Sequence, residues 1–164
     1  MRRALLLAAS LVVATRVAAQ TQPATPPAAP EPTTPGRVYA WGTVGPTFAY
    51  GNTYGSLGLG VGYRMPSNLA PNVELTYNFG PEPTFWTLRP GVTWFIPISL
   101  GHPFIGGYLT HWFVNDAGDR NGIGARAGFS IGRILSFAIT YDHAIGCSQS
   151  CDLWTPSLTA GITL

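Results

Sequence analysis

The stretch NVELTYNF, residues 72–79, decides the fold of this chain. Polar and apolar side chains take turns along it: Asn72, Glu74, Thr76 and Asn78 alternate with Val73, Leu75, Tyr77 and Phe79. A period of two places the two kinds of side chain on opposite faces of a β-strand. The same alternation returns, with breaks, between Val38 and Leu164. The sequence therefore predicts a sheet with one apolar and one polar face.

Connections rich in Gly, Asn, Pro and Ser divide residues 37–164 into eight expected strands. Each strand and its connection take about 16 residues, which suits the roughly 9–11 residues of a tilted strand that crosses a bilayer. An even number of antiparallel strands can close, so we predict an all-β fold, an eight-stranded antiparallel up-and-down transmembrane β-barrel. The expected strands are residues 38–50, 57–65, 72–79, 85–95, 104–114, 123–131, 135–144 and 154–164.

Charged side chains are expected on the inner face of this barrel. An isolated buried charge is very costly, so inward charges should be paired and hydrogen-bonded. The interior of eight strands is only wide enough for side chains to fill. We therefore predict a polar ionic network in the lumen, either as structural glue or as the gate of a narrow pore. Its expected members are Arg64, Glu74, Arg89, Arg126 and Asp142.

The register of two hairpins can be predicted, because a slip by one residue would exchange the two faces. In the hairpin of residues 72–95, an allowed register pairs Tyr77 with Trp86 and Glu74 with Arg89. In the hairpin of residues 123–144, a three-residue turn pairs Phe129 with Phe137. Small inward residues, such as those of the Gly-rich segment 57–64, would leave room in a narrow interior.

Aromatic residues cluster toward the expected strand ends, as in the two girdles of membrane barrels. One girdle is expected to contain Tyr50, Tyr77, Phe79, Phe85, Trp86, Trp112, Tyr141 and Trp154, and the other Tyr63, Trp94 and Phe104.

Two features complicate the strand pattern. Pro46, Pro90 and Pro156 fall inside expected strands, where each removes a hydrogen-bond donor and normally marks an edge or a bulge. In the fifth strand Gly106 and Gly107 are adjacent and both faces hold large apolar residues, so the sequence leaves its faces ambiguous.

The N-terminal part of the chain has a different composition. Residues 1–19 have two arginines, an apolar run and small residues before Gln20, which predicts a signal peptide. Residues 20–36 are almost entirely Pro, Ala, Thr and Gln, which predicts a disordered spacer ahead of the barrel at 37–164. Without the three leader arginines, six Arg face seven acidic residues and there is no Lys. Nothing in this balance supports binding to nucleic acid.

Cys147 and Cys151 lie four residues apart in a chain expected to be exported, which favours a local disulfide. Two thiolates alone do not make a zinc site. The run NDAGDRNG at 115–122 has Ala117 where a calcium loop begins and lacks its distal Glu. We therefore predict no metal and no cofactor.

The alternation in residues 38–164 and the export signal resemble small Gram-negative outer-membrane barrels of the OmpX, OmpA-barrel and OmpW kind. The final strand alternates from Trp154 to Leu164 as theirs does, although it ends in Leu and not in an aromatic residue. The resemblance implies a monomer in the outer membrane, surrounded by lipid and lipopolysaccharide, inserted by the barrel-assembly machinery and carrying its spacer in the periplasm.

Two other functions stay open. A rim-site lipid A modifying enzyme, such as a deacylase or acyltransferase, would need a nucleophile and a base near His143 or His111, with Ser148 or Ser150. Adjacent strand residues point to opposite faces, so Asp142 cannot orient His143. A secreted, soluble, lipocalin-like binding barrel would need an apolar lumen and a charged exterior, the reverse of the predicted faces.

Overall fold

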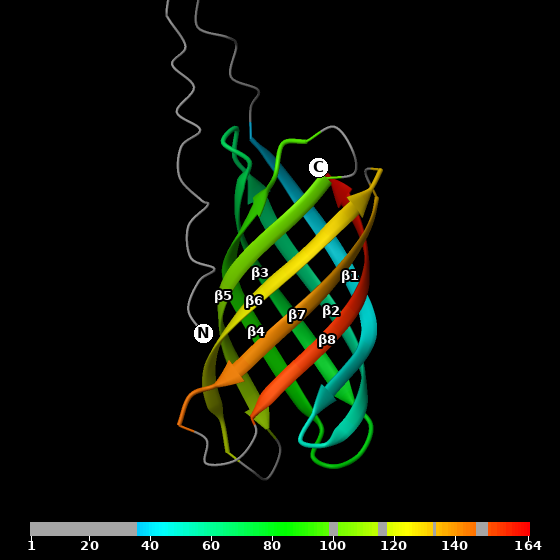
Figure 1. Cartoon of the computed structure of the whole chain (residues 1–164), viewed down its shortest axis with the longest axis vertical. Coiled ribbons are helices and arrows are strands. Elements are labelled where there is room, and N and C mark those ends of the chain that lie inside the picture. Colours follow the sequence, from blue (N-terminus) through cyan, green and yellow to red (C-terminus); the bar gives the residue numbers. More distant parts are fainter. Residues whose placement is uncertain (1–35, 99–101, 115–117, 133, 147–150) are drawn as a thin grey trace, which may run out of the picture. The chain divides into compact units, whose positions relative to one another are not determined.

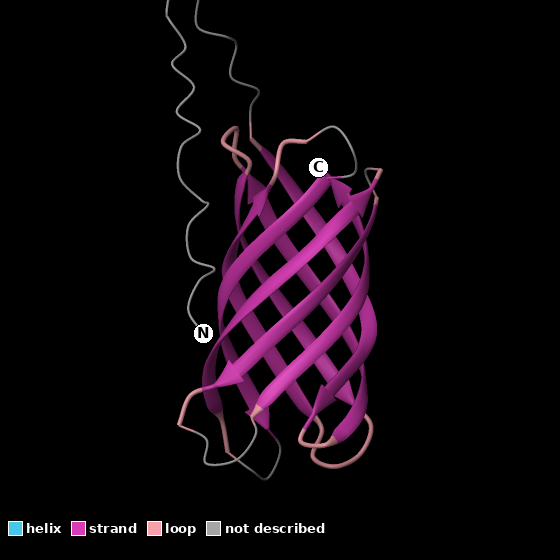
Figure 2. Cartoon of the chain, in the orientation of Figure 1, coloured by secondary structure: helices cyan, strands magenta, loops and turns pink. Residues whose placement is uncertain are grey.

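The computed structural model describes residues 36–98, 102–114, 118–132, 134–146 and 151–164. In this part of the chain eight strands form one closed barrel in which every strand pairs antiparallel with its sequence neighbours and β1 pairs with β8 (Figures 1 and 2). The strands are β1 Arg37–Ala49, β2 Asn52–Arg64, β3 Leu69–Phe79, β4 Phe85–Phe95, β5 His102–Val114, β6 Arg120–Ile131, β7 Leu135–Ala144 and β8 Asp152–Thr163. No helix in these ranges is long and apolar enough to cross a membrane.

The two ends of the barrel differ in what they carry. The start of β1 and the C-terminus lie at the same end (Figure 1), which we call the terminal end. The connections β1–β2, β3–β4, β5–β6 and β7–β8 lie at the other end, which we call the loop end.

The predicted registers are confirmed. Tyr77 pairs with Trp86 and Glu74 with Arg89 between β3 and β4. Phe129 pairs with Phe137 between β6 and β7. The predicted bounds of β4 and β7 also agree with the structure.

The connection between β1 and β2 is much shorter than the loop expected at residues 51–56. Ala49 pairs with Asn52, which leaves a turn of Tyr50 and Gly51 alone. Their φ angles of 52° and 74° are both positive, as a type I′ hairpin turn requires. The strands continue to the turn because Tyr54 packs into the barrel, where its side chain is 1% exposed.

The three prolines interrupt the hydrogen-bonded ladders without changing their register. Pro46 and Pro156 face each other where the β1–β8 pairing has a gap between Val44 and Phe48. Pro90 lies in the gap of the β4–β5 pairing between Leu88 and Gly91. The register is the same on both sides of each gap, so neither is a bulge. The closed barrel has no edge strand either, so each proline leaves a gap in one ladder and marks neither an edge nor a bulge.

The outer face of the barrel is apolar and the inner face is polar in its middle. Leu59 on β2 points outward and is 74% exposed. Glu74 on β3 and Asp142 on β7 point inward and are 3% and 0% exposed. Large apolar side chains are exposed on every strand. Among the described strand residues, Asp152 at the loop end is the one Asp, Glu or Arg whose side chain lies on the outer face. This distribution contradicts the soluble lipocalin-like alternative.

Inward glycines face inward aromatic rings on neighbouring strands. Trp41 lies opposite Gly60, and Phe104 lies opposite Gly128. A Cβ atom at either glycine would overlap the facing ring, so the missing side chain provides the space that the ring fills. The same relation settles the faces of β5, because Gly106 lies opposite the inward Arg126. The full set of ring and glycine pairs is Tyr39 with Gly62, Trp41 with Gly60, Phe104 with Gly128 and Tyr108 with Gly124.

Candidate functional site in the barrel lumen

The lumen contains a cluster of four charged side chains at mid-height, which we call the ionic network: Glu74, Arg89, Arg126 and Asp142. Arg89 lies between the two carboxylates, with Nη1 3.3 Å from Glu74 Oε1 and Nη2 2.9 Å from Asp142 Oδ2. Arg126 Nη2 donates to Glu74 Oε1 at 2.6 Å. Two negative and two positive charges thus neutralise each other inside the barrel.

Neutral side chains complete the hydrogen bonds of the network. Trp41 Nε1 donates to Glu74 Oε2 at 2.9 Å, so this carboxylate accepts bonds at both oxygens. Thr76 Oγ1 accepts from Arg89 at 2.9 Å, and Thr140 Oγ1 accepts from Arg126 at 3.1 Å. Buried ions need such saturation, because pairing alone rarely offsets their desolvation.

The structure brings together four of the five residues predicted for the network, and Arg64 lies apart from them. Arg64 Nη2 donates to Asn68 Oδ1 at 2.7 Å, and its guanidinium lies 4.5 Å from the centre of the Phe95 ring. Arg126 lies diagonally opposite Asp142 on the neighbouring strand, yet the ion pair of Asp142 is with Arg89 of β4. Trp41 was missed, since a single tryptophan among apolar residues gives no sign of a hydrogen bond to a carboxylate.

A group of buried, mostly apolar side chains closes the lumen at the loop end, and we call it the apolar plug. Its rings meet edge to face or tilted, with centres 5.2 Å apart for Tyr54 and Phe85 and 6.2 Å apart for Phe85 and Trp112. Tyr50 packs against it from the turn, and burial raises the pKa of this tyrosine. The members of the plug are Ala49, Tyr54, Phe85, Trp112, Val114, Ala144, Cys151 and Leu153.

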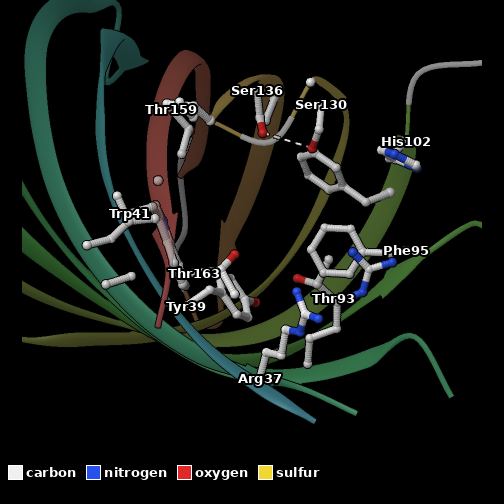
Figure 3. Close-up of a pocket in the computed structure, with 18 of the residues that line it drawn as sticks. Arg37, Tyr39, Trp41, Thr93, Phe95, His102, Ser130, Ser136, Thr159 and Thr163 are labelled. Carbon is white, nitrogen blue, oxygen red and sulfur yellow. Dashed lines mark hydrogen bonds between the residues drawn. The ribbon is translucent and has the colours of Figure 1, made fainter. Parts of the chain in front are cut away.

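The terminal end of the lumen is open, and we call this cavity of about 330 Å³ the vestibule (Figure 3). Trp41 and Arg126 line it and also belong to or contact the ionic network, so the network forms its floor. Its walls combine arginines, aromatic rings and hydroxyl groups: Arg37, Arg64, Tyr39, Phe95, Phe104, His102, Thr93, Ser130, Ser136, Thr159 and Thr163.

The predicted aromatic girdles need correction. Trp112 and Phe104 are 0% and 7% exposed, and Phe85 is 1% exposed, so all three lie inside the barrel. The prediction for them was wrong because the double glycine in β5 concealed which face is which, and Phe85 begins its strand. Tyr50 lies against the plug. The aromatic residues of the prediction that do lie on the outer face are Tyr63, Tyr77, Phe79, Trp86, Trp94, Tyr141 and Trp154.

A small polar cluster lies on the outer face near the loop end. His143 Nδ1 is 2.9 Å from Asp152 Oδ1, and the Tyr141 hydroxyl donates to the same oxygen at 2.7 Å. Asp142 points into the lumen and does not touch this histidine, as predicted. Asp152 is opposite His143 on β8, a partner that sequence order alone does not reveal.

Several predictions fall outside the described residues. The signal peptide, the spacer, Ser148, Ser150 and Cys147 lie there, so the disulfide between Cys147 and Cys151 stays a prediction. Within the described ranges, no group of three or more His, Cys, Asp or Glu residues could hold a metal ion.

No protein-family model and no curated protein matches the sequence. Among solved structures, Neisserial surface protein A (NspA) is similar at 14% identity, with a TM-score of 0.55 over 79% of this chain and 97% of that protein. The N-terminal β-barrel domain of Pseudomonas aeruginosa OprF is similar at 12% identity, with a TM-score of 0.52 over 79% of this chain and 99% of that domain. The outer membrane enzyme PagL is similar at 18% identity, with a TM-score of 0.50 over 77% of this chain and 99% of PagL.

At these identities the comparisons show the fold. The chain is a closed, eight-stranded, all-antiparallel barrel of the transmembrane type, as the alternation predicted. Its architecture is that of the small outer-membrane barrels, and its lumen is filled at the loop end and at mid-height.

Proposed function

We propose that this chain is an integral outer-membrane barrel whose lumen is closed in its resting state. The observation that carries this proposal is the reversal of polarity across the wall: exposed apolar side chains surround all eight strands, while ion pairs are buried inside. A lipid bilayer favours this distribution, because hydrocarbon solvates an apolar exterior. The closed set of strands hydrogen-bonds the backbone polar groups that lipid cannot. In water the same exterior would be an aggregation hazard.

The orientation rests on the described ends of the barrel. The start of β1 and the C-terminal residue Leu164 share the terminal end with the turn at Met65–Asn68, and the resemblance to small outer-membrane barrels implies that the segment before β1 is periplasmic. We therefore place the terminal end and the predicted spacer in the periplasm. Every strand has two partners and no edge is left, which favours a monomer inserted by the barrel-assembly machinery among lipids and lipopolysaccharide.

The closed lumen favours a structural role over a permanently open pore. The apolar plug and the ionic network lie in series along the axis, so an ion would have to pass both. Reconstituted into planar bilayers, the protein should show no sustained conductance, and membrane fractionation should find it in the outer membrane with heat-modifiable migration on gels. Recovery as a soluble periplasmic protein would refute the proposal, and a steady open conductance would refute the closed resting state.

A substitution on the outer face tests lipid contact directly. Leu59 lies in the middle of β2 and is the most exposed apolar side chain of that strand. Leu59→Arg should lower the free energy of unfolding in phospholipid by roughly 2–4 kcal/mol, and Thr53→Arg near the loop end by roughly 0–1 kcal/mol. Urea titration of protein folded in vesicles measures both. Equal losses of stability in the Leu59 and Thr53 variants would mean that hydrocarbon does not surround the middle of the barrel.

The contact between His143 and Asp152 keeps the lipid A modifying enzyme as a second candidate. A histidine oriented by a carboxylate is half of a general-base arrangement, and it lies on the outer face, where lipid would reach it. The described residues place no serine, threonine or cysteine side chain in hydrogen-bond contact with this histidine. Expression of the wild type should leave lipid A mass spectra unchanged; a change that His143→Ala abolishes would establish the enzyme instead.

A further inference from the structure

The charges of the lumen do not balance at the terminal end. Within the ionic network two guanidiniums offset two carboxylates, whereas Arg37 and Arg64 lie beyond it on the vestibule wall. No ion pair among the described residues includes either arginine, and no Asp or Glu lines the vestibule. His102, which pairs with Ser130 of β6, lines the cavity from another side. The ionisable side chains that line the cavity are therefore basic only.

One of these arginines is held in position before any ligand arrives. Arg64 is fixed by its hydrogen bond to Asn68 at 2.7 Å and by the ring of Phe95 at 4.5 Å. A guanidinium that lies over a ring can still present donors to a ligand, and its planar fork matches a carboxylate. A fixed donor binds an anion at a lower cost in side-chain entropy than a flexible one.

The wall near these arginines is aromatic and flat. Tyr39 and Trp41 stack with ring centres 5.0 Å apart and planes 18° apart, above the glycines of β2. The Phe95 ring meets Tyr39 edge to face, with centres 6.2 Å apart, and lies tilted against Phe104, with centres 5.7 Å apart. This surface suits a flat apolar body next to an anionic group.

The opposite wall carries two hydroxyl groups. Ser130 and Ser136 lie on one side of the cavity and Arg37 and Tyr39 on the other (Figure 3). The two serine oxygens are 2.9 Å apart, so one hydroxyl donates to the other. A polar atom of the ligand would find a partner there.

We propose that the vestibule binds a small organic anion with a flat apolar body, and that aromatic carboxylates are its ligand class. The carboxylate would lie between Arg37 and Arg64, and the ring against Tyr39 and Trp41. The volume of about 330 Å³ lies at the lower limit of small-molecule sites, about 300–1,000 Å³, and is too small for a lipid with several acyl chains. Because the ionic network forms the floor, the ligand enters and leaves by the terminal end.

The experiment uses the membrane-purified chain in phospholipid nanodiscs, so that no detergent competes for the cavity. The probe is 2-naphthoate, and the control compound is the uncharged 2-naphthylmethanol. Binding is followed by calorimetry and by tryptophan fluorescence, since Trp41 lines the site. We expect saturable binding of naphthoate, and binding of the alcohol at least about tenfold weaker because it lacks the charge-assisted pair.

Matched variants locate the site. Arg64→Gln and Arg37→Gln should each weaken naphthoate binding about tenfold, whereas Arg120→Gln, the same change near the loop end, should alter it less than about twofold. Equal affinity for the acid and the alcohol, equal effects of the three variants, or no binding at all would overturn the proposal. Heat-modifiable migration of each sample shows whether the barrel has formed, so a failed ligand site and a failed membrane barrel give different results.

Discussion

The two ends of the lumen are built from the same eight strands, yet one is sealed and the other is open. At the loop end Tyr54, Phe85 and Trp112 fill the interior until none is more than 1% exposed. At the terminal end the rings of Tyr39 and Phe95 line a cavity of about 330 Å³. Inward and outward side chains alternate in the same way at both ends. This alternation determines which residues face the lumen, but not whether their side chains fill it.

The difference arises from what faces the rings. In the plug, rings point at other rings across the lumen. In the vestibule, Tyr39 and Trp41 lie flat over Gly62 and Gly60 on the neighbouring strand, so they cover the wall and not the axis. A row of inward glycines can therefore open a narrow barrel even when large aromatic residues lie opposite.

The largest effect is expected where the two ends meet, at Glu74. Glu74→Ala leaves two buried guanidiniums and the Trp41 N–H without this acceptor, so it should lower the free energy of unfolding by roughly 5 kcal/mol, the upper part of the range for a broken buried pair. The matched control is Glu82→Ala in the exposed β3–β4 loop, with an effect within roughly 0.5 kcal/mol. Urea titration in phospholipid vesicles measures both, and similar values would show that the network does not divide the lumen.

A pair of phenylalanines on β4 compares the two ends with identical chemistry. Phe85→Ala removes a fully buried ring from the plug and should cost roughly 3–5 kcal/mol. Phe95→Ala removes a half-buried ring beside an existing cavity and should cost less, roughly 1–2 kcal/mol, because part of this ring already faces the cavity. The same titration gives both numbers. Equal costs would contradict the distinction between a packed and an open end.

The smallest effect is expected at Tyr54. Its hydroxyl is buried in the plug, and no described group forms a hydrogen bond with it. Tyr54→Phe should raise the free energy of unfolding by up to roughly 1 kcal/mol, because removing an unpaired polar group removes its desolvation penalty. Thr87→Val is the comparison, since that hydroxyl donates to the Thr76 carbonyl and its loss should destabilise. A lower stability of the Tyr54 variant would mean that its hydroxyl is paired.

Much of the wall could be predicted from the sequence. Clear alternation around Glu74 predicted the register of β3 and β4. Clear turn residues on either side of β4 and β7 predicted where these two strands begin and end. Segments with mixed patterns gave errors: residues 52–56, expected between two strands, belong to β2, because Tyr54 continues the inward series. The faces of Trp112 and Phe104 depend on which of Gly106 and Gly107 faces the lumen. The sequence of β5 alone does not show which glycine does so.

The contacts across the lumen could not be predicted, because they depend on closure. Arg89 and Asp142 belong to β4 and β7, which are not neighbours, and they face each other across the lumen of the closed barrel. The vestibule has the same origin, since its lining comes from strands at both ends of the sequence. Strand patterns describe pairs of neighbours and contain no information about opposite walls.

The ring and glycine pairs of β5 and β6 also restrict how this hairpin can align. Phe104 and Tyr108 face Gly128 and Gly124, while Gly106 between them faces Arg126. Sliding one strand by two residues keeps every side chain on its proper face, yet it would drive one of the rings onto the arginine. The alternation of large and small inward side chains therefore rules out these two-residue shifts, which the inward and outward alternation alone would permit.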